Sequence, residues 1–237
     1  MYQYETIDRR YGHFSTRQNI QFNWPALERV PDILDQMDEV DMHAIQNSGN
    51  CIRSTTVDHF AGVAPDEVLN PLVYAEIIRQ WSTLHPAFAF LPRKFKISLS
   101  GSPEETAAVM AHDIGLNAVF DYDGRRGFTV VVGGCLGRTP IVGHVIREFL
   151  PAADLLTYLD AILRVYDMHG RRDNKYKARI KSLVKELGVA ELRRQVEHEW
   201  SFREGGPGTL PAGEIARVEA RVTRPVYRAL PQVSAAY

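Results

Sequence analysis

Hydrophobic and polar residues alternate with a period of two in two parts of the chain. Residues 94–100 read KFKISLS, which puts the lysines and serines on one face of a strand and the apolar residues on the other. Residues 13–24 alternate in the same way and predict a strand with one entirely polar face. Residues 117–134 predict a β-hairpin whose turn lies at Asp123 and Gly124.

Apolar residues at helical spacing occupy much of the remaining chain. Asn70 and Pro71 are a typical cap and first position of one helix, and Ser102 with Glu105 forms a capping box for another. Gly188 is typical of the end of a third, strongly basic helix. The predicted helices lie within residues 30–42, 69–86, 102–116, 155–166, 170–188 and 189–200.

Strands and helices interleave along the chain, so the predicted fold class is α/β or α+β, a mixed sheet with helices. Residues 48–63 are rich in small polar residues and are expected to form a loop or a short strand. Glycine and proline become frequent from Gly205 onward, which predicts a linker or tail over residues 205–237.

The composition is that of an ordinary globular protein. Hydrophobic residues make up 45% and charged residues 24% of the 237 residues. Lys plus Arg is 28 and Asp plus Glu is 29, so the overall charge indicates no polyanionic partner, and any basic site is local. There is no long apolar run and no signal-peptide pattern, so we expect a cytoplasmic protein without a membrane segment.

The chain has two cysteines, Cys51 and Cys135, which lie far apart and form no CxxC motif. This number excludes a disulfide framework and a structural zinc site built by this chain alone. We interpret both as buried thiols.

Cationic residues recur in five segments beside small polar residues or glycine. In three of them no acidic residue lies within several positions, which predicts a pocket for a multiply charged anion. Taken singly, an arginine on a strand is more often a solvated edge charge, and a basic helix is more often a solvated face. A nucleic-acid interface over 171–185 would need aromatic platforms or a recognised motif, and neither is present. The cations are Arg17, Arg53, Lys94, Lys96, Arg138, Arg171, Arg172, Lys175, Arg179 and Lys181.

Six stretches of the sequence, taken in order, match a known family. They are HFSTRQNIQFNW, SGNCIRSTTVDHFAGV, LPRKFKISLSG, HDIGL, GGCLGRTP and RRDNKYKARIK. Together they resemble the sirohaem-containing sulfite and nitrite reductases, above all the sulfite reductase haemoprotein (beta) subunits, over residues 8–203. The resemblance implies a partial ferredoxin-like half-domain over residues 6–45 and a sirohaem-binding domain over residues 46–204.

For the cations, the resemblance implies a site for sirohaem, a tetrapyrrole rich in carboxylates, and for the oxyanion that is reduced on it. Arg53, Lys94 and Lys96 would contact sulfite or nitrite as catalytic residues. The two glycines among the ring contacts would let the backbone approach the macrocycle. The residues that would contact the macrocycle are His13, Ser15, Arg17, Gln21, Gly133, Gly134, Arg138, Arg172, Lys175 and Arg179.

The sequence departs from the family at the [4Fe–4S] cluster. In the family, four cysteines in a second half hold the cluster, whereas Cys51 and Cys135 lie in motifs of the first half. MYQYE resembles the start of full-length relatives, and TIDRRYGHFSTRQ resembles a stretch further in. The resemblance therefore implies a shortened first half without the cluster ligands.

Two functions of different class follow. The first is part of a reductase for the six-electron reduction of sulfite to sulfide in sulfur assimilation, or of nitrite. That part is catalytically incomplete alone, and it works with a flavoprotein or ferredoxin as electron donor and a second chain that carries the cluster. The second is a non-catalytic remnant that binds sirohaem weakly or not at all. The same cations suit sulfite and nitrite, so the sequence leaves the substrate open.

Overall fold

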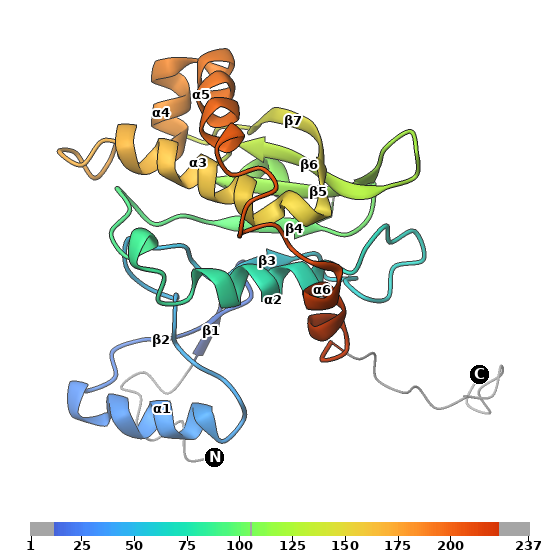
Figure 1. Cartoon of the computed structure of the whole chain (residues 1–237). Helices are drawn as coiled ribbons and strands as arrows, with labels where there is room; N and C mark the ends of the chain where they lie inside the picture. Colours follow the sequence, from blue (N-terminus) through green and yellow to red (C-terminus); the bar gives the residue numbers. More distant parts are fainter. Residues whose placement is uncertain (1–11, 105, 223–237) are drawn as a thin grey trace, which may run out of the picture.

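A mixed five-stranded sheet forms the centre of the computed structural model, which describes residues 12–104 and 106–222 (Figure 1). The strand order is β3-β4-β5-β6-β7, parallel from β3 to β5 and antiparallel from β5 to β7. The strands are β3 (Thr56–Val57), β4 (Ile97–Ser100), β5 (Ile114–Phe120), β6 (Arg126–Val132) and β7 (His144–Pro151). The predicted fold class, a mixed sheet with helices, is confirmed.

Helices α3, α4 and α5 lie beside β5, β6 and β7, and α2 and α6 lie beside β3 and β4 (Figure 1). Helix α3 is buried along most of its length and packs against α5, which also contacts β7. Helix α2 contacts β3 and β4 and is itself covered by α6. The helices are α1 (Val30–Asp38), α2 (Pro71–Ser82), α3 (Leu155–His169), α4 (Ile180–Leu187), α5 (Val189–Ser201) and α6 (Ala212–Glu219). A single hydrophobic core joins the sheet to α2, α3, α4 and α5.

Several local predictions are confirmed. Asn70 caps α2 by accepting the Leu72 N–H at 3.0 Å, and Pro71 occupies the first turn. Strands β5 and β6 form the predicted hairpin, and Gly124 in its turn has φ 76°. Gly188 ends α4 with φ 80°. These signals depend on a few neighbouring residues, which is why they can be predicted from the sequence alone.

The single strand predicted over residues 13–24 is wrong. The chain forms a hairpin instead, with β1 (Gly12–Phe14) antiparallel to β2 (Ile20–Phe22). Gln18 reverses the chain with φ 55°, and the Ser15 N–H donates to the Asn19 carbonyl at 2.8 Å. Arg17 therefore lies in a turn, and its side chain reaches the five-stranded sheet.

The helix predicted over residues 102–116 is also wrong. A 3-10 turn, η4 (Val109–Ala111), is followed after two residues by β5, while Glu105 lies outside the described residues. Ala108 has φ 52°, which breaks a helix, and Ser102 Oγ donates to Asp66 at 3.1 Å. Burial of Ile114 and Leu116 between β4 and β6 overrides the helical signal.

The basic helix predicted over residues 170–188 is shorter in the structure, where α4 starts only at Ile180. Asn174 makes a turn before it, accepting the Tyr176 N–H at 3.0 Å with its side chain and the Lys177 N–H at 2.9 Å with its carbonyl. Such local hydrogen bonds compete with a helix. The cations from Arg171 to Arg179 therefore lie on a loop.

Two further elements differ from the sequence reading. Strand β7 was not predicted, because its apolar residues occur in adjacent pairs and do not alternate singly with polar ones. Helix α6 lies within residues 205–237, expected to be a linker or tail, and buries Val218. The domain boundaries themselves stay a prediction. In the part of the chain that the structure describes, no helix is long and apolar enough to span a bilayer.

Candidate functional site

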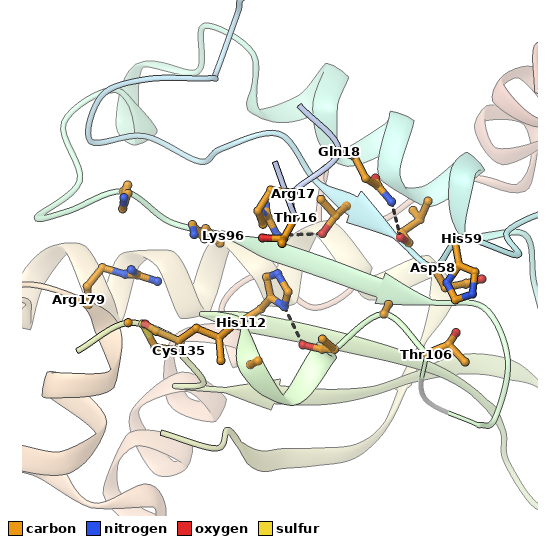
Figure 2. A pocket seen from close by; sticks show the side chains of 18 residues that line it. Thr16, Arg17, Gln18, Asp58, His59, Lys96, Thr106, His112, Cys135 and Arg179 are labelled. Atoms are coloured by element: carbon orange, nitrogen blue, oxygen red, sulfur yellow. Dashed lines mark hydrogen bonds between the residues drawn. The ribbon is translucent and has the colours of Figure 1, made fainter. Parts of the chain in front are cut away.

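A cavity of ≈ 560 Å³ runs along β4, between the β1–β2 turn, η4 and the segment after β6 (Figure 2). Its walls come from parts of the sequence that are far apart. Arg17, Lys94, Lys96 and Arg179 supply its cationic side chains. Among the lining residues are also Thr16, Gln18, Thr56, Asp58, His59, Thr106, His112, Cys135, Leu136 and Gly137. The structure thus brings together four of the cations that the sequence singled out.

Arg17 is held by neutral acceptors. Its Nη1 donates to Thr56 Oγ1 at 2.8 Å and to the Ile97 carbonyl at 3.3 Å, and its Nη2 donates to the Ser54 carbonyl at 2.6 Å. Burial lowers the pKa of Arg17 to about 10, which still leaves the guanidinium charged at neutral pH. Its positive charge is fixed in place but not neutralised.

Lys94 and Lys96 are half-buried, and among the described residues neither ammonium group has a hydrogen-bonding or ion-pair partner. Burial is the main reason why the pKa of Lys94 is lowered, with Arg53 adding to the effect. Burial likewise lowers the pKa of Lys96, helped by Arg17 and Arg179. Unpaired, partly desolvated cations of this kind favour an anionic ligand.

Asp113 holds the Arg179 side chain and the Lys96 backbone in place beside the cavity. Its side chain is fully buried and accepts two hydrogen bonds from Arg179, at 3.0 Å from Nε and 2.6 Å from Nη2. It also accepts the Lys96 backbone N–H at 2.8 Å. Burial raises the pKa of the Asp113 carboxyl, and Arg179 limits that rise. One carboxylate therefore positions a guanidinium and the backbone of a lysine.

Sequence reasoning missed both His112 and Asp113 as site residues. The motif HDIGL contains them and was used only for the resemblance. An acid directly before a strand, in a region of unpaired cations, is the signal that could have identified Asp113. The wrongly predicted helix over 102–116 concealed it.

His112 is the one buried histidine in the part of the chain that the structure describes, and it lines the cavity. Its Nδ1 lies 2.7 Å from the Ala108 carbonyl. Burial lowers the pKa of His112 to about 4, and the charges of Arg17, Lys96 and Arg179 add to the effect. The ring is therefore neutral at neutral pH.

The low pKa of His112 predicts a pH-dependent loss of stability. Between the ordinary histidine pKa near 6.5 and the folded value of about 4, the unfolded chain binds a proton that the folded chain does not. Stability therefore falls as pH drops through this window, by on the order of 3 kcal/mol. Urea unfolding at pH 7, 5.5 and 4 measures it, and the difference between the wild type and His112→Gln isolates this residue. Parallel curves for the two proteins would contradict the prediction.

Arg53 and Arg138 do not line the cavity, although both were expected at it. The Arg53 guanidinium donates to the Asn47 carbonyl at 2.6 Å and to the Gly49 carbonyl at 2.9 and 3.1 Å. Its charge still lowers the pKa of Lys94. Arg138 is exposed, next to the lining residue Gly137.

Arg172 and Lys175 lie on the exposed loop before α4, outside the cavity. Arg172 donates to the Phe90 carbonyl at 2.8 Å and pairs with Asp167 at 2.5 Å. The Lys175 ammonium lies 5.3 Å from the centre of the Tyr176 ring. Of the basic segment expected to contribute, Arg179 alone lines the cavity.

The β1–β2 hairpin brings only its turn to the cavity. His13 is exposed on β1, opposite Gln21 on β2, whose side chain donates to Asn23. Ser15 Oγ accepts the Arg17 backbone N–H at 3.3 Å. None of His13, Ser15 and Gln21 lines the cavity, because the hairpin replaces the expected single strand.

Gly133 and Gly134 are buried beside the cavity but do not line it. A Cβ at Gly134 would lie 2.1 Å from the Met110 carbonyl oxygen, and one at Gly133 would lie 2.8 Å from Val184. Gly133 also has φ 86°. Close packing within the chain therefore accounts for both glycines.

A larger hollow of ≈ 720 Å³ lies between the β1–β2 hairpin and α1. Apolar side chains such as Phe14, Ile33 and Met37 line it, and no lysine or arginine occurs among its described lining residues. The cationic side chains thus lie at the cavity along β4 and not at this hollow.

Comparison with known proteins relates the sequence of this chain to a family. The sequence pattern of the nitrite and sulphite reductase 4Fe-4S domain matches residues 48–204. The chain belongs to this family. All the lining residues of the cavity except those of the hairpin turn lie within the matched part.

Relatives in the family are considerably longer. A sulfite reductase [ferredoxin] of Mycobacterium tuberculosis is 31% identical over 198 residues, which are 83% of this chain and 35% of that protein. A ferredoxin–nitrite reductase of Leptolyngbya laminosa is 28% identical over 80% of this chain and 39% of its own length. The chain thus spans about a third of the length of the curated relatives that it matches.

Solved structures share the fold. The Mycobacterium tuberculosis NirA protein superimposes with a TM-score of 0.72 at 30% identity, over 85% of this chain and 36% of that chain. A dissimilatory sulfite reductase I (DsrI) gives a TM-score of 0.63 at 13% identity, over 95% of this chain and 67% of that chain. The likeness to DsrI is one of fold.

The two cofactors of the nitrite and sulphite reductase family fit this chain differently. Around one cavity, Arg17, Lys94 and Lys96 have no carboxylate partner among the described residues and suit a ligand with several carboxylates, so the residues fit sirohaem. A [4Fe–4S] cluster does not fit. It needs four thiolates, the sequence has two, and no three potential metal-binding side chains cluster in residues 12–104 and 106–222.

Cys135 and Cys51 have different surroundings. Cys135 is buried and lines the cavity, with its Sγ 2.7 Å from the Leu136 carbonyl oxygen. Cys51 is partly exposed, and its Sγ lies 3.1 Å from the Ser48 carbonyl oxygen. The prediction of two buried thiols is correct for Cys135 only.

Proposed function

We propose that this chain is the sirohaem- and oxyanion-binding part of a sulfite or nitrite reductase. The observation that carries the proposal is a single cavity in which Arg17, Lys94 and Lys96 have no carboxylate partner among the described residues. Uncompensated buried charge is costly, and a polyanionic ligand offsets that cost. The names of the relatives, sulfite reductase and nitrite reductase, support the substrate class.

The roles of the cationic residues follow from their chemistry. Arg17 and Arg179 remain charged and would hold carboxylates of the macrocycle or an oxygen of the substrate. Lys94 and Lys96, whose pKa values are lowered, are suited to donate protons as oxygen leaves the substrate as water. When bound, sirohaem supplies the iron chemistry of the six-electron reduction.

Arg53 and Arg138, which were expected to contact a ligand, have indirect roles in the proposal. Arg53 acts on the site through its charge, which reaches Lys94. Arg138 adjoins the lining residue Gly137 and would meet a ligand that extends beyond the cavity. The proposed domains remain a partial ferredoxin-like half-domain over 6–45 and a sirohaem-binding domain over 46–204.

A partner is part of the proposal because the cluster does not fit this chain. A second chain would supply the four thiolates and the [4Fe–4S] cluster. The relatives are named as ferredoxin-dependent, which supports ferredoxin as the electron donor. No step of the reduction is assigned to this chain alone.

The visible spectrum tests the cofactor part of this proposal. The chain, purified from cells that make sirohaem, is expected to carry tetrapyrrole absorption bands, because its cavity offers unpaired cations to the carboxylates. The same chain from cells unable to make sirohaem is the control and is expected to be colourless. A colourless protein from both sources would favour the non-catalytic remnant.

A further inference from the structure

His112 brings a hydrogen-bond acceptor into the cationic part of the cavity. The groups that face it are cations from three separate elements: Arg17 from the β1–β2 turn, Lys96 from the segment before β4, and Arg179 from the segment before α4. Figure 2 shows the His112 ring within the cavity, below Arg17 and Thr16. Lysine and arginine side chains can only donate, so His112 differs from them in kind.

The contacts of His112 decide which of its ring nitrogens is the acceptor. The Ala108 carbonyl oxygen can only accept, so Nδ1, at 2.7 Å from it, carries the proton and donates. In a neutral ring the other nitrogen, Nε2, then has a free lone pair. Among the described residues Nε2 has no hydrogen-bond partner.

Asp113 and Asp58, the aspartates of this part of the site, have other partners than this nitrogen. Asp113 is engaged by Arg179 and the Lys96 N–H. Asp58 lines the cavity, but its oxygens accept the backbone N–H groups of Phe60 at 2.9 Å and Gly101 at 3.2 Å. The cations around His112 keep its ring neutral, as burial does.

A neutral acceptor among donors distinguishes oxyanions by whether they carry a proton. Near neutral pH, sulfite is present partly as hydrogensulfite, whose O-protonated form can donate a hydrogen bond. Nitrite is the base of a stronger acid and offers only lone pairs, which would face the lone pair of Nε2. An unmatched acceptor pair in a desolvated site costs affinity.

We propose that His112 is a specificity-determining residue that makes this cavity prefer hydrogensulfite over nitrite, through a hydrogen bond from the protonated oxygen to Nε2. The inference rests on the proposed function, because it assumes that the oxyanion binds beside Lys96. It names sulfite as the substrate, which the cations alone leave open.

Calorimetric titration of the purified full chain with sodium sulfite and sodium nitrite, at one neutral pH, tests the inference. The wild type is expected to bind sulfite about tenfold more tightly than nitrite, the worth of one such hydrogen bond. His112→Phe removes the acceptor and is expected to weaken sulfite binding about tenfold, while nitrite binding becomes somewhat stronger because the repulsion from the Nε2 lone pair is lost. In His112→Gln the amide can turn its donor to nitrite, which is expected to bring the two affinities close together.

Lys96→Met is the matched control, because the lost ammonium group serves both anions equally. It is expected to weaken sulfite and nitrite binding by similar factors, leaving their ratio unchanged. A wild type that binds both anions equally, or prefers nitrite, overturns the role of His112 and leaves the proposed function standing. A wild type that binds neither anion overturns both.

Nuclear magnetic resonance of the wild type keeps the inference testable if the His112 variants do not fold. With ¹⁵N-labelled histidine, sulfite is expected to shift the Nε2 resonance of His112, while nitrite leaves it in place. A purely structural histidine would respond to neither anion. Equal responses to both anions, or none to sulfite, would overturn the proposal.

Discussion

Replacing Asp113 by alanine is expected to lower the free energy of unfolding by about 3–5 kcal/mol, the usual cost of removing one partner of a buried ion pair. Asp113 is fully buried, and Arg179, whose side chain is 14% exposed, would be left as an uncompensated charge. The Lys96 backbone N–H would lose its acceptor as well. Urea unfolding followed by circular dichroism measures the change.

Two variants calibrate this result. Asp113→Asn keeps a hydrogen-bonding oxygen and loses the charge, so it is expected to be less damaging than alanine. Asp173→Ala removes an exposed partner of Arg171 and is expected to leave stability unchanged, because solvent screens that pair. An Asp113→Ala protein as stable as Asp173→Ala would show that the buried pair does not hold the site together.

Replacing Lys94 and Lys96 together by methionine is expected to weaken the binding of a polyanion in the cavity about 100-fold. Each ammonium group is worth about 1.5 kcal/mol or more when it donates to a charged acceptor, and about 1.4 kcal/mol corresponds to a factor of ten. Methionine keeps much of the apolar stem, so the walls of the cavity remain. The retained tetrapyrrole absorbance per chain, measured after dialysis, reports the loss.

The matched control replaces Lys177 and Lys185, which are exposed and outside the cavity, by methionine. It removes the same charge and is expected to retain wild-type absorbance. Equal losses in both double variants would mean that overall charge, and not the cavity, holds the ligand. Folding of the Lys94/Lys96 variant is expected to be unimpaired or slightly improved, because burial already disfavours both charges.

What the sequence predicted well depends on neighbouring residues. The cap at Asn70, the turn at Gly124 and the end of α4 at Gly188 are each specified within a few positions. The gathering of Arg17, Lys94, Lys96 and Arg179 was predicted from unpaired charge and from family motifs, and the cavity brings them together.

What the sequence did not show depends on contacts across the fold. Arg17 points into the cavity because Gln18 reverses the chain, not because of strand alternation. The roles of His112 and Asp113 depend on η4 and β5, where burial overrides a helical pattern. Arg53 was expected in the cavity, but nearby carbonyls of residues 47 and 49 hold its side chain.

The turn of the β1–β2 hairpin has a consequence for when ligand capture becomes feasible during folding. Arg17 reaches Ser54 and Thr56, which lie 37 and 39 positions further along the chain. Closing a loop of that length costs entropy that only the finished tertiary contacts repay. On the proposed function, a nascent chain therefore presents its full set of cations to sirohaem only once the hairpin has docked, so insertion of the macrocycle follows or coincides with that docking.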